Sequence, residues 1–549
     1  MDHARTYFEL ANTYKNRGDM ERAIYYYQKV LDIVPDSANT YLNMGNAFKV
    51  LGQTDKAVSC YRKVLEMHPE DTGAWINIGL AFKERGMNRE ALCCYERAIE
   101  ISPGEAKAYT LAGDIFRDLG QLEKAFSWYQ TALRLRPDLP KAHIDIGGIC
   151  FQQEKFEEAR LCCEKALSLK PDYVEALYNL AITLEALGRV KEAMEMYTRV
   201  LTLDPRHRDA ALNRSLCLLL TGNFDDGWRE YENRIVPDEW KNVYPYRYNL
   251  PRWDGSPLEG KKIFVHDEQG IGDTIQFVRY LPMVKSLGAT VILETRKSLF
   301  GLFQNFHGID RLVERRVSGD PVEACDCYIP LLSLPGIFGT RPDSIPASVP
   351  YLFADAQKAN HWHNRLSGPE FKTGLVWRGN PRHKKDRSRS CALQHFEQLS
   401  MLTGLKIFGL QKMDSAAVNK ELSGRTWIKN LGREFRDFTD TAAVIANLDL
   451  VVSVDTAVAH LAGAMGKPVW LLLPFVPDWR WMTKREDSPW YPSMRLFRQP
   501  QRGVWASVVE NVRRALKRLL DSSPEAVAPE TMNKWTFDEH AEDREAICF

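Results

Sequence analysis

A 34-residue period runs through the first 235 residues of the chain. It carries prolines, at Pro35, Pro69, Pro103, Pro137, Pro171 and Pro205. It also carries turn glycines, with Glu154 filling the one gap, at Gly18, Gly52, Gly86, Gly120, Gly188 and Gly222. Because glycine relaxes a turn and proline ends a helix, each period predicts two antiparallel helices. One pair cannot bury its apolar face alone, so we expect six full pairs and a partial seventh to stack over residues 1–235.

This pattern resembles the tetratricopeptide repeat, which implies a superhelix whose groove binds a protein or peptide. Four asparagines share one position of the first helix, Asn43, Asn77, Asn179 and Asn213. The column resembles the asparagine ladder of O-linked N-acetylglucosamine transferases, in which amide groups hydrogen-bond a peptide backbone. Glu9, Leu111 and Asp145 interrupt it. A solvated helix face that tolerates asparagine is the alternative explanation.

The 34-residue repeat pattern ends after residue 235. Residues 236–260 are rich in proline and aromatic residues, which predicts a packed connector rather than a flexible linker. Short apolar strands then alternate with helical patterns, at Lys262–His266, Val291–Glu294, Cys327–Pro330, Lys372–Trp377, Lys406–Leu410, Leu450–Val454 and Val469–Leu473. This alternation predicts an α plus α/β protein with two Rossmann-like halves of parallel sheet, 261–350 and 351–520, and a polar tail over 521–549.

Charge and cysteine usage exclude several function classes. The 73 basic and 72 acidic residues give a net charge of +1, so the chain has no excess of positive charge that would indicate nucleic-acid binding. We see neither a signal peptide nor an apolar run long enough to span a membrane, so we expect a cytoplasmic protein. The 11 cysteines include no Cys-x-x-Cys unit, which favours reduced, buried thiols over a zinc site.

The first half opens with a strand followed by Glu268-Gln-Gly-Ile-Gly-Asp273. Gly270 and Gly272 let backbone amides approach a ligand at the start of the next helix, beside Gln269. The third glycine of a dinucleotide fingerprint is absent, because Ile275 stands there. Asp273 is placed where a carboxylate faces the cleft, and a helix N-cap is the equally good structural explanation.

The second half carries two further motifs. Strand Leu450–Val454 leads into Asp455-Thr456-Ala457, and His460 lies one turn into the following helix. A helix N-terminus of small residues suits a diphosphate, although a lone histidine is often structural. The other motif is a basic loop, 378–389, in which seven cationic or imidazole side chains follow a strand. They could clamp phosphates or form a solvated charge run.

Together with Trp377-Arg-Gly-Asn380 and Pro474–Trp481, these motifs resemble the ADP-heptose heptosyltransferases of lipopolysaccharide synthesis and related bacterial repeat proteins. The resemblance covers about residues 230–518. It implies the two-domain GT-B architecture, with the acceptor on the first half and the nucleotide sugar on the second. By this resemblance Asp273 corresponds to the general base, and Asp455, Thr456 and His460 to diphosphate contacts. Ala457 stands where heptosyltransferases usually have glycine, which leaves heptose itself open.

We therefore expect a glycosyltransferase with Asp273 as catalytic base and Gln269, Gly270 and Gly272 on the acceptor side. The expected donor contacts are Asp455, Thr456, Ala457, His460, Arg378, Asn380, Lys384, Lys385 and Arg389. No Asp-x-Asp pair occurs in the chain, so we expect no metal and no cofactor beyond the nucleotide-sugar co-substrate.

Two other functions stay open at this point. The α/β region could be catalytically inactive, which would make the chain a protein-interaction scaffold. The acceptor could also be a glycolipid or polysaccharide rather than a protein recruited by the repeats. The exposed edges of a repeat array also allow a homo-oligomer.

Overall fold

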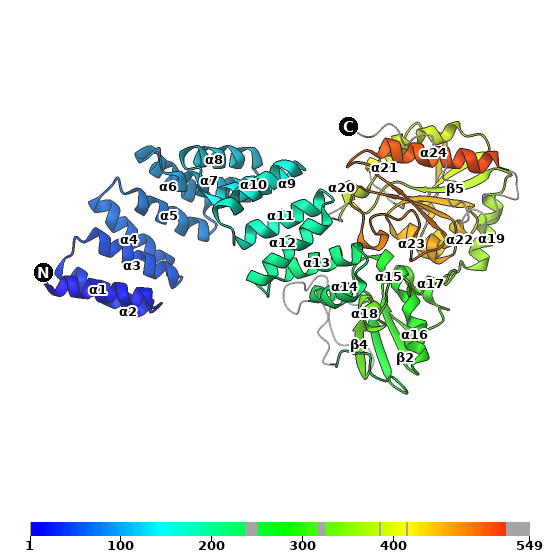
Figure 1. Cartoon of the computed structure of the whole chain (residues 1–549), viewed down its shortest axis with the longest axis horizontal. Helices are drawn as coiled ribbons and strands as arrows, with labels where there is room; N and C mark the ends of the chain where they lie inside the picture. Colours follow the sequence, from blue (N-terminus) through cyan, green and yellow to red (C-terminus); the bar gives the residue numbers. More distant parts are fainter. Residues whose placement is uncertain (1, 236–249, 316–323, 384–385, 413–415, 523–549) are drawn as a thin grey trace. The chain divides into compact units, whose positions relative to one another are not determined.

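The computed structural model describes residues 2–235, 250–315, 324–383, 386–412 and 416–522. The chain divides into two compact units, Met1–Asp204 and Pro205–Phe549, coloured along the sequence in Figure 1. Most of the expected connector, residues 236–249, lies outside the described residues, as does the tail from residue 523. No described helix combines the length and apolar character that crossing a membrane requires.

The first unit consists of six antiparallel helix pairs. Their bounds are α1 Asp2–Asn16, α2 Met20–Ile33, α3 Ala38–Val50, α4 Thr54–Met67, α5 Thr72–Glu84, α6 Asn88–Ile101, α7 Ala106–Asp118, α8 Leu122–Leu135, α9 Pro140–Gln152, α10 Phe156–Leu169, α11 Val174–Ala186 and α12 Val190–Leu203. The predicted repeat helices are confirmed, because each pair occupies one 34-residue period.

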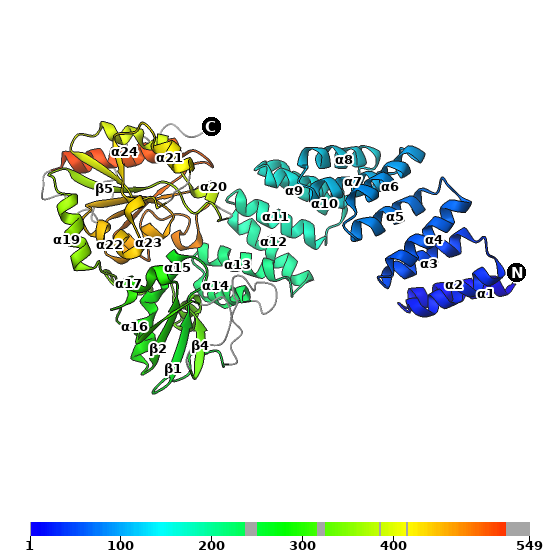
Figure 2. The ribbon, with the colours of Figure 1, turned by 180° about the vertical axis from the view of Figure 1, so that it is seen from behind.

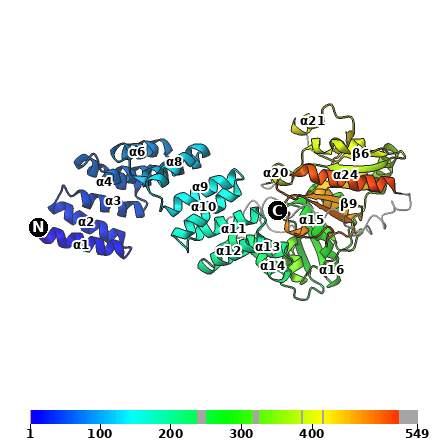
Figure 3. The same ribbon diagram turned by 45° about the horizontal axis from the view of Figure 1, so that its top comes forward.

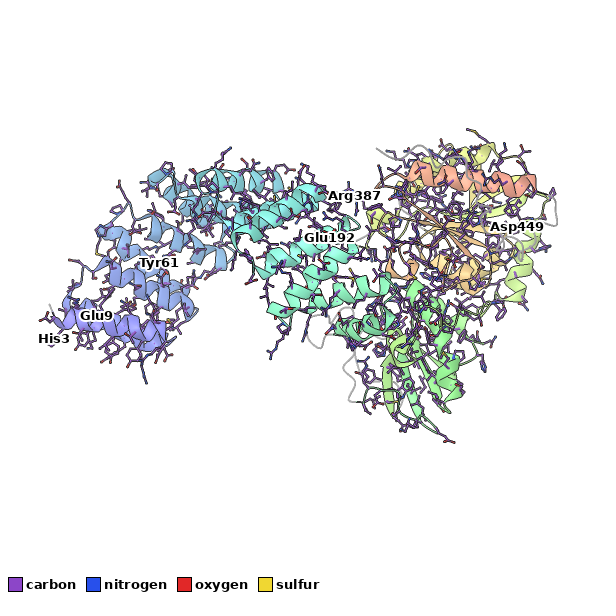
Figure 4. All side chains as sticks on the ribbon, viewed as in Figure 1. His3, Glu9, Tyr61, Glu192, Arg387 and Asp449 are labelled. Atoms are coloured by element: carbon purple, nitrogen blue, oxygen red, sulfur yellow. The ribbon has the colours of Figure 1, made fainter. Side chains whose placement is uncertain are left out.

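The helices of a pair pack closely where a glycine on the first helix faces a tyrosine on the second. A Cβ atom added to Gly113 on α7 would lie 2.7 Å from Cε1 of Tyr129 on α8, so only glycine fits there. Gly45 and Tyr61 are related in the same way two repeats earlier, and Tyr61 is labelled in Figure 4. Where the turn glycine is missing, Glu154 takes its left-handed conformation, with a φ of 61°.

The second unit begins with a seventh helix pair, α13 (Arg208–Leu220) and α14 (Phe224–Tyr231), followed by the short helix η1 (Glu232–Arg234). The indole N–H of Trp228 on α14 donates to the carbonyl of Thr340 at 2.9 Å. Trp228 also meets Trp479 edge to face, with ring centroids 5.2 Å apart. The expected array of residues 1–235 is thus divided between the two units, and its last pair packs on the α/β region.

The first half of the α/β region holds a four-stranded sheet in the order β3-β2-β1-β4. Its strands are β1 Lys262–His266, β2 Thr290–Thr295, β3 Arg311–Glu314 and β4 Cys327–Pro330. All pairings are parallel, and β1 lies between β2 and β4, as Figure 2 shows. The helical segments are α15 Ile271–Phe277, η2 Val278–Tyr280, α16 Leu281–Ser286, η3 Lys297–Leu299, α17 Phe300–Phe303, η4 Leu331–Ser333 and α18 Leu334–Ile337.

The second half holds a six-stranded parallel sheet in the order β10-β9-β8-β5-β6-β7. Its strands are β5 Phe371–Val376, β6 Leu405–Gly409, β7 Ile428–Asn430, β8 Leu450–Val454, β9 Val469–Leu473 and β10 Met494–Arg498. Counted from β5, this is the doubly wound order 3-2-1-4-5-6. The strand order reverses between β5 and β8, and ligands of such sheets bind at the carboxyl ends of the strands at that point.

Helices cover both faces of this sheet. The segments are α19 Ala356–Arg365, α20 Asp386–Arg389, η5 Leu393–Met401, α21 Ala416–Leu422, η6 Gly432–Glu434, α22 Phe438–Ala446, α23 Ala457–Ala464, η7 Trp479–Trp481 and α24 Trp505–Asp521. Figure 1 shows α24 along one side of the sheet and α22 and α23 on the other. In Figure 3, α15 of the first half lies next to the second half, where it packs against α23.

The α plus α/β class predicted from the sequence is confirmed. The seven predicted strands are present with small shifts at their ends, whereas β3, β7 and β10 were missed. Each missed strand lies at the edge of its sheet. Edge strands are short and only half covered, so they lack the continuous apolar run that marks a central parallel strand.

Candidate functional site

The loop after β5 carries the basic residues, and its first cation is already paired. Arg378 donates from Nε to Glu421 of α21 at 3.0 Å, and the indole of Trp377 donates to the same carboxylate at 2.8 Å. Asn380 is exposed and its side chain accepts the backbone N–H of Arg382 at 3.0 Å, so it shapes the turn. Lys384 and Lys385 lie outside the described residues.

A cavity of about 560 Å³ opens on this loop, lined by Arg378, Pro381, Arg382, His383, Asp386, Arg387, Ser390, Cys391 and Ala392. Arg389, on the same loop, is paired with one of these residues. Its Nε is 3.3 Å from Asp386 Oδ1, and its charge lowers the pKa of both Asp455 and His460. Arg389 therefore faces the motif after β8, whereas Arg378 is held by α21. Figure 4 labels Arg387 on the same loop.

The motif after β8 forms the start of α23. Thr456 is the N-cap residue, in extended conformation, and its hydroxyl lies 3.2 Å from that of Ser453 rather than capping the helix. Asp455, Thr456 and Ala457 are partly exposed, so the helix N-terminus is open to a ligand. His460 is buried, with its Nδ1 3.0 Å from the hydroxyl of Tyr491.

Burial acts in opposite directions on the two titratable groups of this motif. It lowers the pKa of His460 to about 3, with the charge of Arg480 as the next cause. Burial also raises the pKa of Asp455 to about 6, and the carboxylate of Asp478 adds to that rise. His460 is therefore neutral at ordinary pH and offers a hydrogen bond rather than a charge.

Three carboxylates follow β1, and each meets an arginine from a different segment. Asp267 accepts from Arg296 and Arg315, both at 3.1 Å. Glu268 is fully buried against Arg234 of η1, at 2.8 Å.

The third, Asp273, accepts the backbone N–H of Gly270 at 2.7 Å and is paired with Arg480 of η7. It remains 18% exposed. Gln269 has a φ of 57°, and its amide donates to the hydroxyl of Tyr231 at 2.8 Å.

The two halves meet through α15 and α23. A Cβ atom on Gly272 would lie 2.8 Å from Cδ2 of His460 and 3.4 Å from Cα of Ala457, so glycine is needed for this approach. The contact brings the loop after β1 and the loop after β8 into one site. Arg480 contributes to the electrostatics of Asp273, Asp455 and His460 alike.

Sequence reasoning did not assign a role to Arg480. The stretch Pro474–Trp481 carries the resemblance, and an arginine between two tryptophans is a visible signal. Its partner Asp273 lies 207 positions away, and a contact at that separation cannot be read from local patterns.

The asparagine column is divided by the boundary between the units. Asn43, Asn77 and Asn179 lie on the first helices of their pairs in the first unit, and Asn213 lies on α13 in the second. The amide of Asn43 is engaged within the protein, since its oxygen accepts from Lys15 at 3.0 Å and its nitrogen donates to the carbonyl of Asn39 at 2.9 Å. That the asparagine column binds a peptide stays a prediction.

Comparisons with known families match both the repeats and the α/β region. Tetratricopeptide repeat models match residues 2–70, 36–103 and 77–140, and residues 110–211 match the middle TPR-like domain of cilia and flagella-associated protein 70. Residues 411–472 match glycosyltransferase family 9 (heptosyltransferase). Tetratricopeptide repeat models thus match the first part of the chain, and a glycosyltransferase family 9 model matches one segment of the second half of the α/β region. That segment includes β8 and the whole of α23, but neither Asp273 nor the basic loop.

Relatives are similar over part of the chain. Protein FlbA of Caulobacter vibrioides is 30% identical over 325 residues, which are 54% of this chain and 53% of the relative. The chain thus spans about half the length of that relative. YrrB, a TPR protein with an unusual peptide-binding site, is 21% identical with a TM-score of 0.28, over 34% of this chain and 95% of its own. MamA from Desulfovibrio magneticus RS-1 is 25% identical with a TM-score of 0.29, over 32% and 98%.

Proposed function

We propose that the second unit transfers a sugar from a nucleotide-sugar donor to an acceptor hydroxyl. One observation carries the proposal. The order of the six-stranded sheet reverses between β5 and β8, and the basic loop and the N-terminus of α23 follow those two strands. This is the position at which doubly wound sheets bind nucleotides. The family 9 match over residues 411–472 supports the same position.

The donor contacts are assigned by their chemistry. The hydroxyl of Thr456, the free amides at the start of α23 and the guanidinium of Arg389 suit the diphosphate, because all three offer donors or positive charge. Asp455 accepts hydrogen bonds when it is ionised, so we assign it to hydroxyl groups of the donor rather than to phosphate oxygens. His460 is neutral and packs against Gly272, which leaves it a supporting role.

On the acceptor side, Asp273 is the proposed general base. The acceptor oxygen attacks the anomeric carbon of the sugar, its proton passes to the Asp273 carboxylate, and the bond from that carbon to the diphosphate oxygen breaks. The departing nucleoside diphosphate takes the bonding electrons, and Arg389 and the α23 amides stabilise its charge. No metal takes part in this scheme, which follows from the lack of an Asp-x-Asp pair in the sequence.

The repeats supply the acceptor in this proposal. Tetratricopeptide repeats bind peptides and proteins in their groove, so we propose that the first unit recruits a protein to be glycosylated, in the cytoplasm. Binding of an acceptor protein to the repeats separates this from transfer to a glycolipid or polysaccharide.

Donor binding tests the proposal. Nucleoside diphosphates and their sugars, with uridine, guanosine or adenosine as the base, and CMP with its sugars are added to the full chain during thermal unfolding. One base is expected to raise the unfolding temperature, because a ligand that binds only the folded state stabilises it by mass action. Thr456→Val and Arg389→Met are expected to reduce that rise.

Lys406→Met is the matched control. Like Arg389→Met, it removes one positive charge from the second half. Lys406 lies near the amino end of β6, whereas the site lies at the carboxyl ends of the strands. An equal loss of stabilisation in Lys406→Met and Arg389→Met, or no stabilisation by any nucleotide, contradicts the proposed donor site.

A further inference from the structure

Arg480 belongs to the second half and contacts three side chains. Two of them, Gln276 and Asp273, lie in the first half, and Asp478 lies in the second. Arg480 donates from Nε to Oε1 of Gln276 at 2.7 Å and from Nη1 to Oδ1 of Asp478 at 2.8 Å. Its Nη2 is paired with Oδ1 of Asp273. The side chain is only 6% exposed. A planar guanidinium with its donors shared among these acceptors has one orientation, which fixes Asp273 as well.

The surroundings of Arg480 hold it in that orientation. Its guanidinium lies over the ring of Trp479, 4.3 Å from the centroid, and 5.5 Å from the centroid of Phe277. The segment then turns through Met482, whose φ of 53° is in the left-handed region that a non-glycine residue enters only when its surroundings impose it. Met482 Cε is close enough to Gly222 of the seventh helix pair that an added Cβ would lie 3.1 Å from it.

Charges from several elements face Asp273. They come from α14, the loop after β1 and the η7 segment, and are Tyr231, Glu268, Asp478 and Arg480. His460 of α23 lies against the neighbouring Gly272. Burial raises the pKa of Asp273, and the carboxylates of Asp478 and Glu268 add to the rise. Arg480 and the amide of Gly270 lower it. His460 is neutral and Tyr231 keeps its proton, so neither supplies a countercharge.

A buried general base must be ionised before the acceptor arrives, and it must point at the acceptor. We propose that Arg480 is the positioning residue for Asp273: from the opposite half it keeps the carboxylate ionised and orients its free lone pairs toward the site. This rests on the function proposed above, because the role is defined by the base that Arg480 serves. A purely structural ion pair between the halves is the alternative that the experiment must exclude.

The experiment measures the titration of Asp273 itself in the full chain without substrate. Difference infrared spectra between the wild type and Asp273→Asn isolate the carbonyl band of the protonated Asp273 carboxyl across a pH series. In the Arg480→Gln background the same difference is taken again. The midpoint is expected to rise by about 1–3 pH units, since a neighbouring arginine lowers the pKa of an aspartate by that amount.

Two further variants keep the result decisive. Arg480→Lys retains the charge but lacks the planar fork that fixes the orientation of the pair, so the midpoint rises less than in Arg480→Gln while turnover still falls. Asp478→Asn removes an anion that faces Asp273 and leaves Arg480 in place, so the midpoint is expected to fall. If circular dichroism shows that Arg480→Gln does not fold, the titration midpoints of Arg480→Lys and Asp478→Asn test the proposal instead.

Turnover of the nucleotide sugar that the wild type binds gives the second readout. In Arg480→Gln the acid limb of the pH profile is expected to move upward by the same number of pH units as the infrared midpoint, whereas a merely structural role leaves the limb in place. An unchanged midpoint in the folded Arg480 variants overturns the proposal. A shifted midpoint in a chain that turns over no nucleotide sugar instead leaves the ion pair as described and refutes the transferase function.

Discussion

At the scale of single residues, the repeats show how one missing partner changes the role of a buried group. The hydroxyl of Tyr27 donates to Asn12 at 2.7 Å and that of Tyr61 donates to Asn46 at 2.8 Å, each 15 positions earlier. Tyr95 continues the tyrosine column, but Leu80 stands 15 positions before it. Among the described residues its buried hydroxyl has no hydrogen-bond partner.

Because Tyr61 has a hydrogen-bond partner and Tyr95 has none among the described residues, replacing each by phenylalanine gives a matched comparison. Tyr61→Phe is expected to lower the free energy of unfolding of the repeats by about 1 kcal/mol, because it removes a hydrogen bond and leaves Asn46 unpaired. Tyr95→Phe is expected to be neutral or stabilising, because it removes a buried polar group that makes no bond. Denaturant unfolding of the full chain, followed by circular dichroism, compares the two. Equal losses in both variants contradict this explanation.

Asp455 gives a prediction for pH dependence. Its pKa is raised from its ordinary value to about 6 by burial, so the folded protein binds a proton there that the unfolded chain releases between about pH 4 and 6. Stability from this group is present at low pH and is lost as the pH rises through about 6. Asp455→Asn is therefore expected to raise the free energy of unfolding by about 1–3 kcal/mol at pH 7–8 and to have little effect at pH 4.

Thermal unfolding of the wild type and Asp455→Asn from pH 4 to 8 measures this difference. A gain of the same size at both ends of the range shows that the asparagine stabilises for another reason. The expected stabilisation at neutral pH also indicates that Asp455 is kept for a purpose other than stability, as charged groups in functional sites often are.

The residues of the site were predictable from the sequence only where local patterns mark them. Asp455 directly follows a buried strand and precedes α23, and Asp273 lies in the first turn of α15 after β1, so their positions could be inferred. Arg389 was expected from the basic loop, but the partner of Asp273 could not be inferred, because Arg480 comes from a distant segment that only the fold brings to it. The ion pair of Arg378 with Glu421 was equally invisible, since the two residues lie 43 positions apart.

At the scale of elements, the site depends on one contact between α15 and α23. Gly272 allows it, since a methyl group would press on His460, which is itself enclosed by Trp481 and Tyr491 at centroid distances of 5.4 and 5.7 Å. Because the imidazole has no room to move, the two helices must separate if the group at position 272 grows.

Gly272→Ala is therefore expected to cost about 1–3 kcal/mol in unfolding free energy, although alanine favours a helix more than glycine does. It is also expected to weaken donor binding, because α23 is displaced. Gly148→Ala is the control for helix propensity, since Gly148 lies on α9 with nothing within 4 Å of an added Cβ. It is expected to stabilise the repeats by about 0.5–1 kcal/mol. Calorimetry on both variants checks the signs, and a stabilised Gly272→Ala contradicts the contact described.

The elements of the repeats were predictable to within a few residues because one period recurs six times. The α/β region was less so. Central strands such as β8 read as continuous apolar runs, whereas the edge strand β3 is Arg311–Glu314, with charge at both ends. Strand order is set by crossovers between distant segments, so the reversal between β5 and β8 became visible only in the fold.

At the scale of the whole molecule, the boundary between the units falls inside the repeat pattern. The seventh helix pair continues the 34-residue period, yet it belongs to the unit that begins at Pro205. Arg234, Tyr231 and Trp228 tie this pair to Glu268, Gln269 and Thr340 of the first half. We infer that the pair is part of the α/β unit and supports the loop that carries Asp273.

Cleavage of a nucleotide sugar by the full chain tests whether the second unit is a transferase with Asp273 as its base. Release of free nucleotide is measured with UDP-, GDP-, ADP- and CMP-sugars, with water as the acceptor, for the wild type and Asp273→Asn. We expect release from one class of donor, a loss of turnover of about 10²–10⁴-fold in Asp273→Asn, and donor affinity unchanged within about twofold. Equal turnover in the variant, or donors that all stay intact, would contradict this expectation.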